Sequence, residues 1–313
     1  MSVYISGSLA FDRIMTFPGN FQDHILPDKT HMINISFMAN HMEERRGGCA
    51  GNIAYAMTMF GEKPYILSSA GRDFDGYAAH LSRCGLPLDG IRRDDSMFTA
   101  NCYVTTDKKN NQITGFYPGA MNTPCGYTFP NLDPANDIAI VSPGNIDDMR
   151  SFCRFYREKG VRYIYDPGQQ IPVLSKSDLL EAVEGAFALI TNDYELNMVC
   201  KTIEKTPEEL AAALPWLITT LGEHGCRITG AVSETLPAVP CGPVLDPTGA
   251  GDAHRGGILT ALSRGLDIPE AVRVGAVCAS FAVECLGTQE YTYDRETFRK
   301  RYEGSFGPLP AAI

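Results

Sequence analysis

The chain has 313 residues, of which 44% are hydrophobic and 20% charged, as expected for a folded globular protein with one large domain. Its formal net charge of −10 disfavours general binding to nucleic acids and anionic membranes, because both attract cationic surfaces. The opening residues lack a basic segment followed by a long apolar run, and no stretch reaches membrane-spanning length. We therefore expect a cytoplasmic protein with no nucleic-acid partner and no membrane attachment.

The ten cysteines include no C-x-x-C pair. This spacing gives no support for a zinc site or a thioredoxin-type redox motif. In a chain of this length we interpret the cysteines as free thiols in a reducing compartment, most of them small core residues.

The first part of the chain combines an alternating helix and strand pattern with two strand-rich segments. These segments, within 11–46 and 98–118, lack helical periodicity, and polar residues at 107–111 separate two strand-like runs. That arrangement predicts a hairpin. The elements expected here are strands at 3–5, 64–70, 98–106 and 112–116 and helices at 48–60 and 73–84.

From residue 138 onward, short apolar runs alternate regularly with helical patterns. Repeated β–α units of this kind favour a mostly parallel sheet with helices on both faces. We expect one three-layer α/β/α domain over 1–313, with a small β-sheet lid built from about 11–46 and 98–118. The elements expected here are strands at 138–141, 163–165, 188–190, 216–221 and 226–232 and helices at 149–159, 179–183, 207–214, 249–264 and 269–286, with Thr206 as an N-cap.

The strongest local signal is the segment Asp246-Pro-Thr-Gly-Ala-Gly-Asp252, directly before a predicted helix. Its two glycines let the backbone approach a ligand, and the helix N-terminus offers free N–H groups to an anion. Such a loop suits the charge of a transferring phosphoryl group, and Asp252 can accept a proton from the attacking hydroxyl. Taken alone, the segment also fits a tight turn whose aspartate complements the helix dipole. It is neither a Rossmann fingerprint nor a P-loop.

Three further motifs accompany this segment in a characteristic order. They are Gly-Gly-Cys-Ala-Gly-Asn at 47–52, Asn-Asp-Tyr-Glu at 192–195 and Thr-Leu-Gly-Glu-His-Gly at 220–225. Together the four motifs resemble the ribokinase-like (PfkB) carbohydrate kinase family over essentially the whole chain. Within that family, the segments at 7–12, 15–19, 116–121 and 166–170 are similar to those of bacterial ribokinase-like adenosine kinases.

The resemblance implies a ribose site near the start of the chain. Asp12 would accept hydrogen bonds from the 2′- and 3′-hydroxyls, with Gly48 and Asn52 on the other side of the sugar. Two structural alternatives stay open at this point: Asp12 as a turn carboxylate after a strand, and Asn52 as a cap of its own helix.

The resemblance also implies an ATP and Mg²⁺ site in the second half. Asn192 and Glu195 would help to hold Mg²⁺, largely through water, which suits an ion that keeps several waters. The alternative for this pair is a solvated helix start. Thr220, Gly222 and Gly225 would lie along the phosphates and ribose of ATP, with Asn192 beside them.

The loop at the second helix start would serve two purposes in this family. Gly249, Ala250 and Gly251 would supply the anion hole beside Asp252. Asp246 and the Thr248 backbone resemble one half of a monovalent-cation site, for K⁺, whose other half would come from 282–287.

The purine base is expected to meet long amides and an aromatic ring. Gln169 and Gln170 offer both donors and acceptors to a purine edge, Phe116 can stack on the base, and Ser8 and Ser36 can bond to the base or ribose. A second aromatic that similar kinases place near residue 102 is replaced by Cys102, which would weaken base binding by about 0.5–1.5 kcal/mol. Tyr103 should face the other side of the strand, because side chains alternate.

His254 replaces an apolar residue common in the family. No function follows from its type or spacing. We interpret it as a histidine of the core or of an interface.

These observations predict adenosine kinase activity: ATP and adenosine give ADP and AMP, a reaction of purine salvage. A kinase for another nucleoside, or for a free sugar such as ribose, is the second hypothesis, although a bare sugar would not need Gln169, Gln170 and Phe116. A nucleoside-binding protein without catalysis is the third, and the intact Asp252 and Glu195 disfavour it. Because the edges of an exposed small sheet pair readily, a homodimer through the lid is also expected.

Overall fold

The computed structural model describes residues 1–24 and 36–313, and its central feature is a nine-stranded sheet. Seven neighbouring strands run parallel, and two antiparallel strands extend one edge. This confirms the mostly parallel sheet. Across the sheet the strands are β13 (Ser233–Leu236), β12 (Cys226–Gly230), β11 (Trp216–Thr220), β10 (Ala188–Asn192), β9 (Arg162–Tyr165), β8 (Ile138–Val141), β1 (Val3–Ser6), β4 (Tyr65–Gly71) and β5 (Ile91–Asp94).

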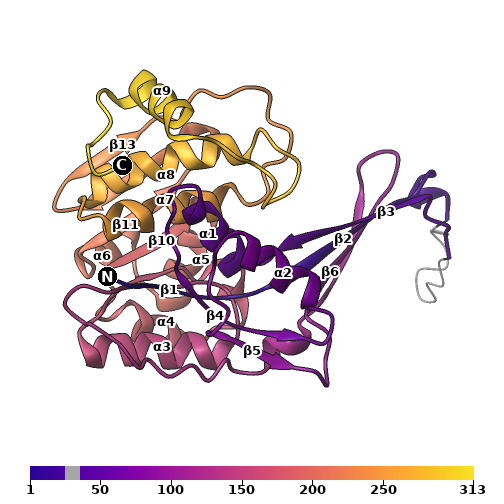
Figure 1. Ribbon diagram of the computed structural model, residues 1–313, viewed down its shortest axis with the longest axis horizontal. Helices are drawn as coiled ribbons and strands as arrows, with labels where there is room; N and C mark the ends of the chain where they lie inside the picture. The colour runs from indigo at the N-terminus through magenta and orange to yellow at the C-terminus, as the bar shows by residue number, and fades with distance from the viewer. Residues whose placement is uncertain (25–35) are drawn as a thin grey trace.

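Helices cover both faces of this sheet (Figure 1). Successive strand residues point to opposite faces, so Ile5 and Ile190 belong to one apolar layer and Tyr4 and Leu189 to the other. The first layer packs against α1 (Cys49–Thr58), α2 (Asp75–Arg83), α7 (Ala250–Ser263), α8 (Ile268–Ala282) and α9 (Arg295–Phe306). The second packs against α3 (Ile146–Lys159), α4 (Lys176–Val183), α5 (Asp193–Ile203) and α6 (Pro207–Ala212).

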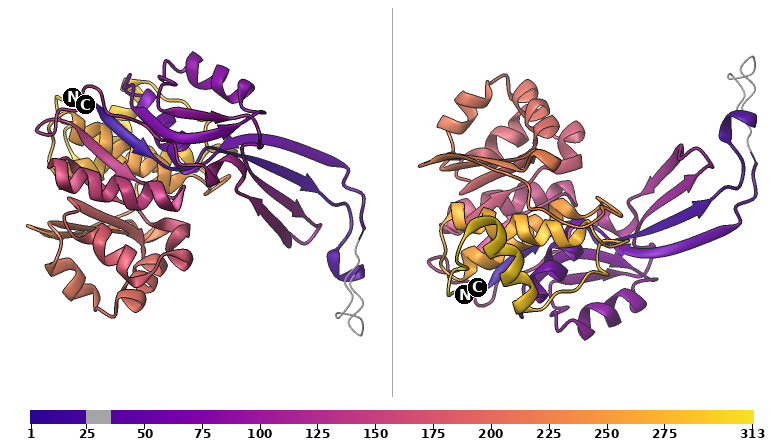
Figure 2. Two further views of the ribbon diagram at one scale, coloured as in Figure 1. Left: turned by 90° about the horizontal axis from the view of Figure 1, so that it is seen from below. Right: turned by 90° about the horizontal axis from the view of Figure 1, so that it is seen from above.

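A second, four-stranded sheet projects from the side of the main body in all three ribbon views (Figures 1 and 2). Its strands, in order, are β3 (His41–Gly47), β2 (Ala10–Thr16), β6 (Ala100–Thr106) and β7 (Gln112–Tyr117). The pair β6–β7 is antiparallel, which confirms the predicted hairpin. Short 3₁₀ turns complete the fold: η1 (Phe21–Asp23), η3 (Gly119–Asn122), η4 (Gly168–Val173) and η5 (Gly222–His224).

Several helices begin where side chains can cap their free N–H groups. Thr206 caps α6 as predicted, and it forms a capping box with Glu209. The helices α3 and α4 begin about one turn earlier than expected, because Asn145 and Ser175 act as their caps.

Three elements were not expected from the sequence, β5, β13 and α9, and α5 was expected only as the alternative helix start at 192–195. The strand β5 carries two arginines and lies at the sheet edge, so its apolar signal is weak. The helix α9 is highly charged and buries only Phe298 and Tyr302. The helix α8 ends at Ala282 and not at 286, because the Val283 carbonyl accepts backbone N–H groups from the loop that precedes α7.

Within the described residues, no helix combines the length and the apolar character needed to cross a membrane.

Candidate functional site

The site lies at the carboxyl ends of the parallel strands, where ligands of open α/β sheets commonly bind. Ser8 follows β1, Asp166 follows β9, and Asn192 and Thr220 end the paired strands β10 and β11. The N-termini of α1 and α7 reach the same region, because Asn52 and Asp252 are hydrogen-bonded to each other.

The loop before α7 has a backbone shape that requires glycine. Gly249 caps the helix with φ of +78°, a left-handed conformation that favours glycine. A Cβ atom there would lie 2.8 Å from the Thr288 side chain. The helix then begins at Ala250, whose N–H group donates to the Pro247 carbonyl at 3.3 Å, and the next N–H group, that of Gly251, is offered to an anion.

Asp252 lies in the first turn of α7 and is partly exposed. Its Oδ2 accepts a hydrogen bond from Asn52 Nδ2 at 2.8 Å. Burial raises the pKa of Asp252 to about 6, although the Asn52 hydrogen bond and the Arg255 charge both favour the ionised form. The carboxylate is therefore ionised at neutral pH and still basic enough to accept a proton.

Asn52 is held by a buried polar network. Its Oδ1 accepts hydrogen bonds from Thr288 Oγ1 at 2.8 Å and from Gln289 Nε2 at 2.9 Å. Gln289 also contacts the hydroxyl of Tyr77, on α2. These contacts fix the amide so that its N–H group points at Asp252. The alternative in which Asn52 caps its own helix is wrong, since α1 has Gly48 as its N-cap and no side-chain cap.

Asp12 lies in the middle of a row of side chains across the small sheet. Arg45, Cys102 and Phe116 occupy the same register on β3, β6 and β7, so the four residues share one face. Burial raises the pKa of Asp12, and the charge of Asp246 adds to this rise while Arg45 opposes it. Asp12 is thus a strand residue and not a turn carboxylate.

Tyr103 takes the opposite face of the small sheet, as predicted. Its hydroxyl accepts a hydrogen bond from Arg13 Nη1 at 2.8 Å, and the Arg13 guanidinium lies 5.6 Å from the ring centroid. Cys102 therefore points to the face of Asp12 and Phe116, where the missing aromatic was expected.

The two glutamines point to different parts of the site. Gln170 and the exposed Phe116 line the same cleft of about 400 Å³, together with Met121 and Asn145. Gln170 Nε2 donates to the Gly144 carbonyl at 2.9 Å, which leaves its Oε1 as an acceptor. Gln169 is exposed, and its Nε2 lies 3.8 Å from Cys49 Sγ.

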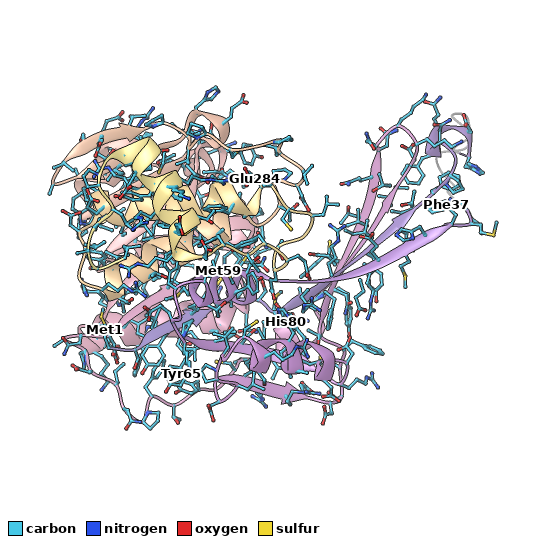
Figure 3. All side chains as sticks on the ribbon, turned by 45° about the horizontal axis from the view of Figure 1, so that its top comes forward. Met1, Phe37, Met59, Tyr65, His80 and Glu284 are labelled. Carbon is cyan, nitrogen blue, oxygen red and sulfur yellow. The ribbon has the colours of Figure 1, made fainter. Side chains whose placement is uncertain are left out.

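The two predicted serines occupy very different places. Ser8 is buried, and its Oγ accepts the Cys49 N–H at 3.0 Å, so it helps to begin α1. Ser36 is exposed and adjoins Phe37, which lies at the outer end of the small sheet (Figure 3). The structure therefore does not bring Ser36 to the other predicted residues.

Asn192 and Glu195 form a capping box at the start of α5. The Glu195 N–H donates to Asn192 Oδ1 at 2.7 Å, and the Asn192 N–H donates to Glu195 Oε2 at 2.8 Å. Burial raises the pKa of Glu195. The helix-start alternative thus describes the local structure correctly, and the Oε1 atom of Glu195 stays available to a water-bound ion. Within the described residues, no three His, Cys, Asp or Glu side chains converge on one metal position.

The turn after β11 has the glycines that its shape needs. Thr220 pairs with Asn192 across the sheet. Gly222 and Gly225 have positive φ, and a Cβ atom at Gly225 would lie 2.0 Å from the Leu236 carbonyl oxygen. A side chain at either position would thus strain the turn.

Asp246 holds together the loop that precedes α7. Its Oδ1 accepts the Thr248 N–H at 3.0 Å, and its Oδ2 accepts the Gly287 N–H at 3.1 Å. Arg45 Nη1 lies 3.6 Å from Oδ2. Burial alone would raise the pKa of Asp246, but these partners outweigh it and lower the pKa.

His254 is buried in the core, as interpreted from the sequence. It lies on α7 against α8, where a Cβ atom at Gly275 would come within 2.8 Å of its ring. Burial lowers the pKa of His254 to about 3, so the ring is neutral.

Sequence reasoning assigned no role to Arg255 and Asp166, which form a buried ion pair beside Asp252. A signal was present: Arg255 is a lone charge in the otherwise apolar middle of a predicted helix. Because arginine is almost never fully buried without a partner, that position called for an acidic residue nearby. Thr288 and Gln289 gave no comparable signal.

Comparisons with known proteins agree with this geometry. The model of the pfkB family carbohydrate kinases matches residues 21–294. A nucleoside kinase of Methanocaldococcus jannaschii is 31% identical over 263 residues, which are 82% of this chain and 85% of the relative. A Burkholderia thailandensis nucleoside kinase, solved in complex with inosine, is 35% identical with a TM-score of 0.85, and the match covers 99% of each chain.

The solved structure of the M. jannaschii nucleoside kinase, described as an archaeal member of the ribokinase family, gives a TM-score of 0.86 at 28% identity. That match covers 97% of this chain and 99% of the other. The architecture described above is thus ribokinase-like, and the chain belongs to the pfkB family of carbohydrate kinases.

Proposed function

We propose that this protein transfers the γ-phosphate of ATP to the 5′-hydroxyl of adenosine. One observation carries the proposal: Asp252 lies beside the glycine loop of α7, with its carboxylate oriented by Asn52 at 2.8 Å. That arrangement supplies a base and an anion site next to each other. The similar proteins of M. jannaschii and B. thailandensis are nucleoside kinases, and the latter was solved with inosine, which favours a nucleoside over a free sugar.

In the proposed reaction Asp252 takes the proton of the 5′-hydroxyl as that oxygen attacks the γ-phosphorus of ATP, and the bond from the γ-phosphorus to the bridging oxygen breaks to release ADP. The Asp252 pKa of about 6 keeps the carboxylate ionised at neutral pH, and Asn52 fixes its direction. The N–H groups of Gly249 and Gly251 stabilise the negative charge on the transferring phosphoryl group, and the Ala250 N–H can join them only by leaving the Pro247 carbonyl, to which it donates at 3.3 Å. Because phosphoryl transfer has a loose transition state, positioning contributes more than basicity.

The nucleoside would lie between the main body and the small sheet. Asp12 is proposed to accept the ribose hydroxyls, with Gly48 beside them. Phe116 and Gln170 share a cleft that suits a base. The free Oε1 of Gln170 can accept from the amino group of adenine and equally from the ring N–H of hypoxanthine. Inosine is therefore the second candidate substrate.

The ATP side of the site is proposed to include Thr220, Gly222 and Gly225 after β11. Asn192 and Glu195 would hold Mg²⁺ through water, since Oε1 of Glu195 is outside the capping box. When bound, Mg²⁺ neutralises part of the phosphate charge.

The residues around Asp246 fit K⁺ poorly. Both oxygens of this carboxylate already accept backbone N–H groups, and Arg45 places a positive charge 3.6 Å from Oδ2. We therefore propose that Arg45 provides the positive charge that a monovalent cation would bring to this loop. On this proposal K⁺ contributes little to kcat or to the stability of the protein.

The small sheet is proposed to act as a lid, built from about 11–46 and 98–118. Its closure over the nucleoside would exclude water and so limit ATP hydrolysis.

The edge strands of the small sheet, β3 and β7, carry the exposed side chains Met42 and Ile113. Because such edges pair readily, a homodimer through this sheet is proposed, and sedimentation equilibrium would measure it.

The proposed function is tested by ATP turnover with Mg²⁺ on adenosine, inosine, guanosine, cytidine, ribose and fructose. We expect the highest kcat/KM with adenosine and a 5′-monophosphate as product. A preference for inosine would keep the nucleoside site and make hypoxanthine, not adenine, the preferred nucleobase. A preference for ribose or fructose would contradict the nucleoside site.

A further inference from the structure

Arg255 makes three hydrogen bonds inside the catalytic region. Its Nε and Nη2 atoms donate to the two oxygens of Asp166, the second at 2.8 Å, and its Nη1 donates to the Gly251 carbonyl at 3.0 Å. Only 7% of Arg255 and 2% of Asp166 are exposed. A bidentate pair of this kind has a fixed orientation, because the planar guanidinium matches the carboxylate.

This guanidinium connects two distant parts of the chain at the site. Asp166 follows β9, and Gly251 belongs to the anion-hole loop at the start of α7. A Cβ atom at position 251 would lie only 2.9 Å from Arg255 Nη1. The absence of a side chain at Gly251 therefore leaves room for the Arg255 guanidinium as well as for the approach of a ligand.

Arg255 is also the cation around which the acidic groups of the site are arranged. It lies one helical turn after Asp252, and the charges of Asp166 and Glu195 act on it as well. The Arg255 charge lowers the pKa of Asp252, whereas the Asp166 charge raises it. The other titratable groups that face Asp252 are the Cys49 thiol on α1 and the buried phenols of Tyr77 and Tyr291.

We propose that Arg255 is a positioning residue for phosphoryl transfer: it fixes the anion-hole loop through Gly251 and balances Asp166 beside the base Asp252. This role rests on the proposed function of the same site. Stability alone is a weak reason for such a pair, because replacing a buried ion pair with apolar residues is often neutral or stabilising. The contact to the Gly251 carbonyl is the feature that stability would not require.

The experiment compares Arg255→Met, Arg255→Lys and the double variant Arg255→Met/Asp166→Asn with the wild-type enzyme. The matched control is Arg264→Met, because Arg264 ends the same helix and pairs with Glu62 away from the site. Each variant is measured for Tm, for kcat and nucleoside KM, and for the pH profile of kcat/KM.

For Arg255→Met we expect kcat to fall about 100-fold, as when an oxyanion donor is lost, with KM for the nucleoside changed less than threefold. The acid limb of kcat/KM should move to higher pH. Without the Arg255 charge, the negative charge of Asp166 raises the pKa of Asp252 further. The double variant should regain the wild-type acid limb but keep a low kcat, since nothing holds Gly251. Arg255→Lys should keep the acid limb and lose part of kcat.

Folded Arg255 variants with kcat within twofold of wild type and an unchanged acid limb would overturn the proposal. A fall in kcat that Arg264→Met reproduces would do the same, because it would point to a general effect of losing an ion pair on α7. If Arg255→Met does not fold, Arg255→Lys and the double variant decide the question. A wild-type protein that phosphorylates none of the acceptors would contradict the proposed function itself, a result visible before any variant is made.

Discussion

The loop and helix that carry Asp252 and the small sheet that carries Phe116 are built in opposite ways. Around Asp252 nearly every polar side chain has a partner: Asn52, Arg255 and Asp166 are held by buried hydrogen bonds. Among the described residues of the small sheet, Ala10 and Ala100 form a small apolar cluster with Met121, and Phe116 is 52% exposed. In the proposed reaction, the main body would supply fixed geometry for phosphoryl transfer, and the small sheet would supply a surface that the nucleoside covers.

The largest effect should come from disturbing the fixed region at Gly249. In Gly249→Ala the left-handed backbone is strained and the new methyl group meets Thr288, so the anion-hole N–H groups move. We expect kcat to fall by about 100-fold or more. The matched control is Gly265→Ala, just beyond the same helix, because Gly265 has φ of +84° but no atom within 4 Å of a new Cβ. Equal losses of kcat in Gly249→Ala and Gly265→Ala would contradict the claim that the backbone shape at Gly249 positions the anion-hole N–H groups.

The pH dependence of the reaction should follow Asp252. With a pKa of about 6, kcat/KM should fall tenfold per pH unit below that value. The folded pKa is raised above the ordinary value of about 3.9, so ionising Asp252 destabilises the fold as pH rises from about 4 to 6. Asp252→Asn should therefore be more stable than wild type at pH 7, by about 1–2 kcal/mol, and equal to it near pH 4. A profile that is flat down to pH 4.5 would contradict this assignment.

A smaller effect is expected in the small sheet. Phe116→Ala removes a stacking surface, so KM for adenosine should rise about 2- to 13-fold, which corresponds to about 0.5–1.5 kcal/mol. Because Phe116 is already exposed, Tm and the KM for ATP should not change. Ile113→Ala, on the other face of the same strand, is the control. Cys102→Phe, in the same row as Phe116, should lower KM by a similar factor. An unchanged KM for adenosine in both Phe116→Ala and Cys102→Phe would exclude the sheet face that carries these two residues as the binding site of the base.

The smallest effect concerns K⁺. At constant ionic strength, replacing choline by K⁺ should change kcat less than twofold and leave Tm unchanged, since Arg45 already lies at Asp246. In Arg45→Gln, the same titration should activate the enzyme and raise Tm. Strong activation of the wild type by K⁺ would show that Arg45 does not replace the cation.

The sequence was most informative where signals are local. The apolar runs at 138–141 and 188–190 and the glycine loop before Asp252 were identified correctly, because burial and turn chemistry act on neighbouring residues. Strand β5 was missed because charged residues at a sheet edge resemble a loop.

Most contacts between the residues of the candidate site could not be predicted from local sequence signals. Asn52 is fixed by Thr288, 236 residues away, and Arg255 by Asp166, 89 residues away. Partners at such separations depend on the topology of the sheet. The sequence therefore did not predict that Asn52 is hydrogen-bonded to Asp252.

The most direct test of the central claim is a single-turnover measurement on Asp252→Asn with saturating ATP, Mg²⁺ and adenosine. Asparagine keeps the shape of the side chain but cannot take a proton. If Asp252 is the base, the rate of 5′-AMP formation should fall by about 10²–10⁴-fold, with KM for adenosine within a few-fold of wild type. A rate within fivefold of wild type would show that another group, or positioning alone, drives the transfer.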